Sequence, residues 1–111
     1  MSITQTDVVD AIGVDTLTGD LVLTVSDHLE WSVDDDDEHL YLLQEKINSY
    51  LRFVESEELS ETYPDAQGRA VVFDILCKYP PTSVARSFYE KIGSIVAGAG
   101  IKLSYRLLPT N

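Results

Sequence analysis

Hydrophobic and polar residues alternate along four short stretches of the chain and recur every three or four residues along two longer ones. Alternation is typical of half-buried β-strands, whereas a spacing of three and four is typical of amphipathic helices. The stretch from Val8 to Trp31 predicts two short strands joined by a turn at Thr18-Gly19-Asp20, since glycine suits tight turns. Residues 69–79 and 101–107 predict a third and a fourth strand.

Two helices are predicted between these strands. The first begins in the acidic run 34–38, where Asp35 and Glu38 have the spacing of a capping box, and ends around residues 57–59. Its apolar positions are Leu40, Leu43, Ile47, Tyr50, Leu51 and Val54. The second begins after a cap at Thr82 or Ser83 and ends at the glycines that follow residue 97. Its apolar positions are Ala85, Phe88, Ile92, Ile95, Val96 and Ala99.

The element order ββαβαβ predicts an α+β fold with a single four-stranded sheet and two amphipathic helices packed on one face. The helix-free face then turns polar side chains toward water, namely Asp74, Lys78, Lys102, Ser104 and Arg106. We expect one domain over residues 1–111, with residues 1–7 as a loose tail. The strand order does not follow from the pattern.

Charge is distributed unevenly along the 111 residues. The chain has 8 Lys and Arg against 19 Asp and Glu, a formal net charge of −11. Residues 27–65 alone hold 13 carboxylates and two cations, Lys46 and Arg52, so they predict one strongly negative surface. Such a surface repels nucleic acid and anionic lipid, and we expect neither as a partner. No apolar run is long enough to span a membrane and no secretory signal begins the chain, which predicts a cytoplasmic protein.

Catalytic motifs are lacking in this sequence. Cys77 lies within a predicted strand on its apolar face, which favours an inert core thiol. There is no nucleophile elbow, phosphate-binding glycine loop or pair of cysteines at metal-binding spacing. We therefore expect a protein that is not an enzyme and needs no cofactor.

The acidic run admits three interpretations. It can be a solvated helix start, or it can bind a divalent ion together with Asp27, His28 and His39, although it lacks the alternation and glycine of an EF-hand loop. It can also dock a basic protein, with aromatic anchors beside the charge. The residues of this last hypothesis are Trp31, Asp34, Asp35, Asp36, Asp37, Glu38, Tyr41 and Tyr63.

The docking hypothesis is the leading one, and an immunity-type inhibitor of a cationic toxin is one concrete version of it. The alternative is a small metal- or ligand-binding protein. Trp31 and Tyr63 can instead pack over the sheet edge or the helix ends. A homodimer through the exposed sheet face or an edge strand also stays open.

Several segments together resemble a family of small uncharacterised bacterial proteins, a domain-of-unknown-function family. The resemblance spans residues 8 to about 81 and rests on Asp10-Ala11-Ile12-Gly13-Val14-Asp15, Thr16-Leu17-Thr18-Gly19, Val25-Ser26-Asp27-His28-Leu29-Glu30-Trp31, Glu38-His39-Leu40 to Gln44-Glu45-Lys46, and Tyr63-Pro64-Asp65-Ala66 with Gly68. It implies a bacterial origin and a single domain, and no activity can be carried over from it.

Overall fold

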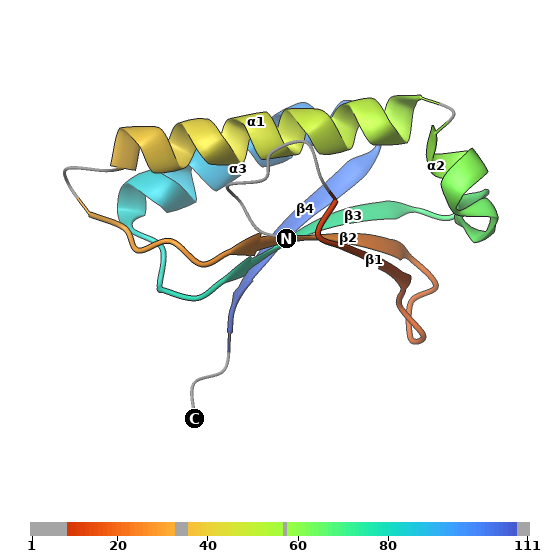
Figure 1. The fold of residues 1–111 in the computed structure, drawn as a ribbon, viewed down its shortest axis with the longest axis horizontal. Coiled ribbons are helices and arrows are strands. Elements are labelled where there is room, and N and C mark those ends of the chain that lie inside the picture. Colours follow the sequence, from red (N-terminus) through yellow and green to blue (C-terminus); the bar gives the residue numbers. More distant parts are fainter. Residues whose placement is uncertain (1–8, 33–35, 57, 109–111) are drawn as a thin grey trace.

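The computed structural model describes residues 9–32, 36–56 and 58–108. Its strands and helices follow the predicted order, with two short helical turns added before the third strand (Figure 1). The elements are β1 (Ala11–Val14), β2 (Leu21–Asp27), α1 (Asp36–Glu55), α2 (Glu58–Thr62), the 3-10 turn η1 (Pro64–Ala66), β3 (Val71–Cys77), α3 (Ser83–Ala97) and β4 (Ile101–Leu107). No helix among the described residues is long and apolar enough to cross a membrane.

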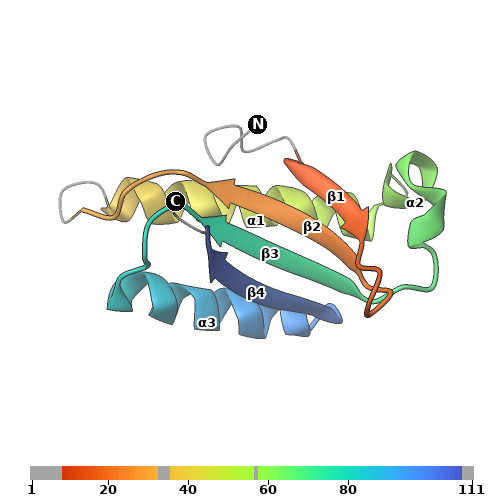
Figure 2. The same ribbon diagram turned by 90° about the horizontal axis from the view of Figure 1, so that it is seen from below.

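The four strands form one mixed sheet in the order β1-β2-β3-β4. β1 pairs antiparallel with β2, while β2 with β3 and β3 with β4 are parallel. Parallel neighbours need a crossover connection, and α1 and α3 supply the two crossovers. Both helices cover the same face of the sheet (Figures 1 and 2), which confirms the predicted α+β fold with its two helices on one face.

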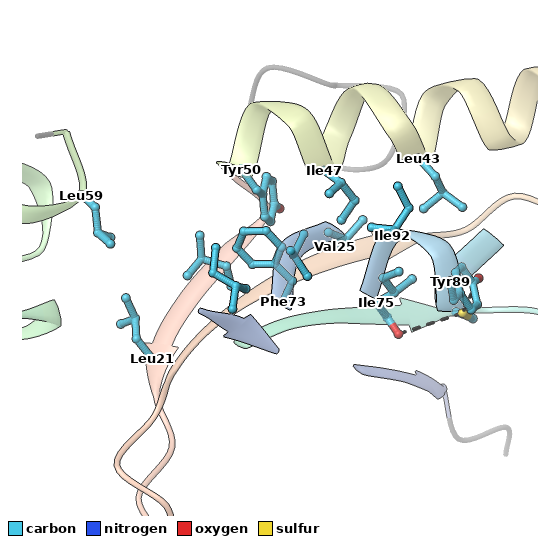
Figure 3. Close-up of a cluster of buried hydrophobic side chains, with 14 of the residues drawn as sticks. Leu21, Val25, Leu43, Ile47, Tyr50, Leu59, Phe73, Ile75, Tyr89 and Ile92 are labelled. Carbon is cyan, nitrogen blue, oxygen red and sulfur yellow. Dashed lines mark hydrogen bonds between the residues drawn. The ribbon is translucent and has the colours of Figure 1, made fainter. Parts of the chain in front are cut away.

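The core lies between the helices and the sheet (Figure 3). Every second residue of β2 points into it, as do alternate residues of β3, because successive side chains of a strand point to opposite faces. Buried residues at the centre of the cluster are Leu21, Leu23, Val25, Leu43, Ile47, Tyr50, Phe73, Ile75 and Val96. The alternation in the sequence therefore predicts the inner face of the sheet correctly.

Three details differ from the prediction. The segment after α1 forms α2, a short helical turn that buries Leu59. In α3, Ile95 was expected in the core and is 62% exposed, whereas Tyr89 is 3% exposed. Tyr89 is large enough to reach the core from the helix face that carries Ala85 and Val96, so the buried stripe lies to one side of the predicted one.

Asp74 also departs from the expectation that it faces water. It lies on the helix-free face but is only 8% exposed. Its carboxylate accepts a hydrogen bond from Arg106 Nε at 2.7 Å and one from the hydroxyl of Ser104 at 3.2 Å. These neighbours on β4 cover the carboxylate and satisfy it. The expected tail at residues 1–7 and the capping position at Asp35 fall outside the described residues.

Candidate functional site

The inner face of α1 carries polar residues at helical spacing. His39, Lys46 and Tyr50 are buried together with Leu43 and Ile47. These positions lie three or four residues apart, so they share the face that rests on the sheet. Each of the three polar side chains finds a partner on the sheet side, and the contacts form two clusters along the helix.

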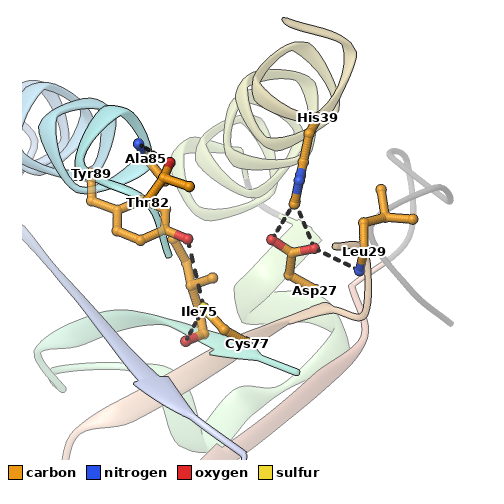
Figure 4. Close-up of polar contacts among 8 residues, drawn as sticks. All are labelled: Asp27, Leu29, His39, Ile75, Cys77, Thr82, Ala85 and Tyr89. Carbon is orange, nitrogen blue, oxygen red and sulfur yellow. Dashed lines mark hydrogen bonds and ion pairs between the residues drawn. The ribbon is translucent and has the colours of Figure 1, made fainter. Parts of the chain in front are cut away.

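The first cluster lies where β2 ends and joins Asp27, His39 and Trp31. His39 Nε2 donates to the Asp27 carboxylate, with distances of 2.8 Å to Oδ1 and 2.6 Å to Oδ2 (Figure 4). The backbone N–H of Leu29 donates to the same carboxylate at 3.2 Å. Trp31 stacks on the His39 ring with a centroid distance of 3.5 Å and an interplanar angle of 15°. The contacts of His39 with Asp27 and Trp31 therefore hold together the end of β2, the residues after it and the first turns of α1.

Three buried polar atoms at this end of α1 have no hydrogen-bond partner among the described residues. They are Trp31 Nε1, Asp36 Oδ1 and His39 Nδ1. A buried polar atom without a partner costs about 1–3 kcal/mol. Because natural proteins leave few such atoms, a group of three around one helix start favours a functional position.

The second cluster surrounds Lys46, whose side chain is 0% exposed. Lys46 Nζ donates to Asp10 Oδ1 at 2.8 Å, and Asp10 Oδ2 accepts from the backbone N–H of Ser26 at 2.8 Å. The Tyr50 hydroxyl donates to the carbonyl of Thr24 at 2.6 Å and accepts from the N–H of Asp10 at 2.9 Å. Burial raises the pKa of the Tyr50 hydroxyl, so it stays protonated and keeps its donor role.

The opposite face of α1 is acidic. Glu38, Tyr41, Glu45, Arg52 and Glu55 follow one another at spacings of three, four and seven residues, and this set is called the acidic stripe below. Tyr41 is 60% exposed in the middle of it. Asp37 at the helix start and two glutamates of α2 extend the negative surface at the two ends.

The structure separates the residues of the docking hypothesis. Asp36, Asp37, Glu38 and Tyr41 lie together in the first two turns of α1. Trp31 is half-buried against His39 at the same end. Tyr63 directly follows α2 in the sequence and packs partly against the core. Asp34 and Asp35 fall outside the described residues.

The metal hypothesis named Asp27, His28 and His39. The structure joins Asp27 to His39 but leaves His28 exposed just after β2 ends. No group of three or more metal-ligating side chains occurs among the residues that the structure describes. The metal site therefore stays a prediction without a geometric counterpart in that part of the chain.

Cys77 is buried at the end of β3, next to Asp27 in the sheet register. Its Sγ lies 3.6 Å from the hydroxyl of Tyr89 (Figure 4). Burial raises the pKa of the thiol, and this disfavours the thiolate that a nucleophile needs. The geometry agrees with the core thiol that the sequence predicts.

Sequence reasoning missed the pair formed by Asp10 and Lys46. Lys46 was counted among the surface charges, although it stands three residues after Leu43 and four before Tyr50, which places it on the buried face. That spacing is the one signal in the sequence. Its partner lies 36 positions away and precedes β1, so no local pattern indicates it.

Comparison with known families gives one match. The model of a family of unknown function, DUF6572, matches residues 1–109. The chain belongs to this family. No curated protein and no solved structure matches the chain. The predicted resemblance to a domain-of-unknown-function family is thus confirmed, and membership in DUF6572 brings no activity with it.

Proposed function

We propose that this chain is a non-enzymatic interaction module and that the acidic stripe docks a basic protein. The proposal rests on one observation above all, the burial of Lys46 against Asp10. This pairing removes one of the two cations of residues 27–65 from the surface. Arg52 is then the one exposed cation among the described residues of that segment.

A net negative charge on a helix face raises the association rate with a positively charged partner. Tyr41 supports the proposal because an exposed aromatic ring amid charge is a typical binding hot spot. Near the start of α1, three buried polar atoms have no hydrogen-bond partner within residues 9–32, 36–56 and 58–108, which is a second, independent feature of the same end.

The anchoring of α1 also supports docking. His39 and Lys46 tie the inner face of the helix to Asp27 and Asp10, so the outer face is held in one orientation before a partner arrives. A preorganised surface binds more tightly, since less side-chain and backbone freedom is lost on association.

An immunity-type inhibitor is the concrete version that we favour. A cationic toxin or nuclease carries a basic substrate site, and a rigid acidic helix is suited to cover it. We also propose that the protein works in the cytoplasm, in keeping with its one free thiol at Cys77.

The test compares two double variants of equal net charge. Glu38→Lys with Glu45→Lys reverses the acidic stripe, whereas Asp20→Lys with Glu90→Lys reverses two carboxylates elsewhere on the fold. Tagged wild-type protein and both variants are used for affinity capture from a lysate of the source organism at low and at high salt. We expect a basic protein that binds the wild type and the second variant at low salt, and that the stripe variant loses.

The captured protein is then purified and its enzymatic activity is measured with and without the wild-type chain. Inhibition by the wild type and not by the stripe variant supports the immunity-type version. Loss of capture in both variants would mean that net charge alone matters, and retention in both would refute the proposal.

A further inference from the structure

The sheet has one long free edge, β4. Among the described residues this strand pairs with β3 alone. The N–H of Leu108 donates to the carbonyl of Cys77 at 2.7 Å, which shows that the backbone of residue 108 faces β3. Since the N–H and C=O of successive strand residues point to alternate sides, those of Leu103, Tyr105 and Leu107 face away from the sheet.

A groove lies at the start of this edge, between α3 and the first residues of β4. It has a volume of about 640 Å³, and the small residues Gly93, Ser94 and Ala97 of α3 line one wall together with Glu90. Ile101 and Leu103 line the other. A Cβ on Gly93 would lie 3.8 Å from the Cβ of Leu103, so the helix comes close to the strand here and leaves space farther out.

The position of α3 decides what can occupy the edge. Figure 2 shows that α3 lies beyond β4, outside the outline of the sheet. A second copy that paired its own β4 here would bring its own α3 to the same place. A single extended segment has no such helix and fits beneath α3.

The charges of the residues around this edge indicate which side chains such a segment would carry. Residues 71–108 hold five cations and two carboxylates. On β4, Lys102 and Arg106 lie on the helix-free face; Arg106 donates through Nε to Asp74 of β3, and its side chain stays 61% exposed. The opposite side of the next strand position faces the apolar wall of the groove. An added strand would therefore place acidic side chains on one face and apolar side chains on the other.

We propose that the β4 edge, together with the groove under α3, is a strand-addition site for an extended peptide that alternates acidic and apolar residues. Main-chain hydrogen bonds to Leu103, Tyr105 and Leu107 provide affinity, and the groove and the cations of β4 provide specificity. The site belongs to α3 and β4, whereas the acidic stripe belongs to α1, and the proposal does not depend on the function of that stripe.

The first experiment uses three fluorescent peptides and the full chain. One peptide alternates valine and glutamate, the second has lysine in place of glutamate, and the third is the first with every second backbone nitrogen methylated. We expect the glutamate peptide to bind at least about tenfold more tightly than either control, because each control removes backbone hydrogen bonds or reverses the charge. In NMR spectra, the amides of Leu103, Tyr105 and Leu107 should shift most and exchange more slowly.

The second experiment uses protein variants. Tyr105→Pro removes one outward N–H without breaking the ladder to β3, and it should weaken binding of the glutamate peptide about tenfold. Gly93→Leu fills the groove and should also weaken binding of the glutamate peptide, because it blocks the space for apolar side chains. Tyr41→Ala on the acidic stripe is the control and should leave peptide binding unchanged.

Several outcomes would overturn the proposal. They are binding that survives both N-methylation and Tyr105→Pro, equal binding of the glutamate and lysine peptides, or amide shifts centred on α1. Self-association of the chain through the β4 amides without peptide would show that a second copy occupies the edge instead. Absence of binding up to the solubility limit of the glutamate peptide would also refute it.

Discussion

Helices α1 and α3 cover the same face of one sheet, but different chemistry holds each of them there. The buried face of α1 carries a histidine and a lysine, each paired with an aspartate. The buried face of α3 carries Ala85, Tyr89, Ile92 and Val96. Its polar contact to the sheet is that of the Tyr89 hydroxyl with Cys77.

The two kinds of packing have different consequences. Hydrogen bonds and ion pairs are directional, so the contacts of α1 specify both its rotation and its position along β2. Apolar packing depends on shape and area and tolerates small adjustments. The helix whose outer face we assign to docking is thus the one that is fixed by directional contacts. The strand beside the other helix carries the edge where we place an added peptide.

Breaking the ion pair of α1 should give the largest effect. Asp10→Ala leaves the buried ammonium of Lys46 without its carboxylate, and removal of one partner of a buried pair costs about 3–5 kcal/mol. Urea unfolding of the variant measures this loss directly.

The double variant Asp10→Ala with Lys46→Met serves as the control. Because both members of this ion pair are removed together, it should recover most of the stability that the single variant loses. A double variant no more stable than Asp10→Ala would show that the pair itself is not the reason for the loss.

The contact of His39 with Asp27 should give the next largest effect. His39→Ala removes both the hydrogen bond and the ring under Trp31, and we expect a loss of about 1–3 kcal/mol. Trp31 is the single tryptophan of the chain, so its fluorescence reports on this site alone. His39→Phe keeps a ring beneath Trp31 but removes the hydrogen bond to Asp27. If its emission spectrum resembles that of the wild type, the stacking of Trp31 does not require that hydrogen bond.

The fold was more predictable than this site. The four strands and two long helices follow from hydrophobic periodicity, which depends on residues close in sequence. Strand order does not, because the β2 to β3 pairing joins segments separated by the whole of α1 and α2. The exposure of Ile95 shows a second limit. A helix can rotate when a larger residue such as Tyr89 fills the core better.

The polar contacts of α1 were the least predictable part. His39 was a candidate from its residue type, but its partner was one of many carboxylates in an acidic segment. Lys46 looks like a surface charge until Asp10 is known to lie beside it. The partner of a buried charge is set by tertiary structure, which the local pattern does not contain.

The contact between Tyr89 of α3 and Cys77 of β3 should make the stability of the protein depend on pH in the alkaline range. Burial raises the pKa of both the Tyr89 hydroxyl and the Cys77 thiol above their ordinary values. The unfolded chain then loses these protons first. The stabilisation is complete below the ordinary pKa values and decreases as the pH rises past them.

We expect the free energy of unfolding to fall with pH above the ordinary cysteine and tyrosine values, and to fall less steeply in Tyr89→Phe. Urea unfolding at a series of alkaline pH values measures both slopes. Because Tyr50 contributes in the same direction, Tyr50→Phe is the matched comparison on the side of α1. An unchanged slope in Tyr89→Phe would exclude Tyr89 as a cause.

The smallest effect should come from Gly93 in α3. An added Cβ meets only Leu103, at an ordinary contact distance of 3.8 Å. Alanine is about 0.5–1 kcal/mol more favourable than glycine within a helix, so Gly93→Ala should raise the melting temperature slightly. Gly100, whose φ is +78°, is the opposite case, and Gly100→Ala should lower it.

Because Lys46 is buried, chemical labelling of its side chain can report on the opening of the structure around α1. Amine-reactive reagents reach the exposed ammonium groups of Lys78, Lys91 and Lys102 in the native protein. They reach Lys46 only when α1 lifts from the sheet, because its side chain is fully enclosed. The ratio of label at Lys46 to label at these lysines, read by mass spectrometry, therefore measures how often α1 detaches, in a mixture or inside a cell.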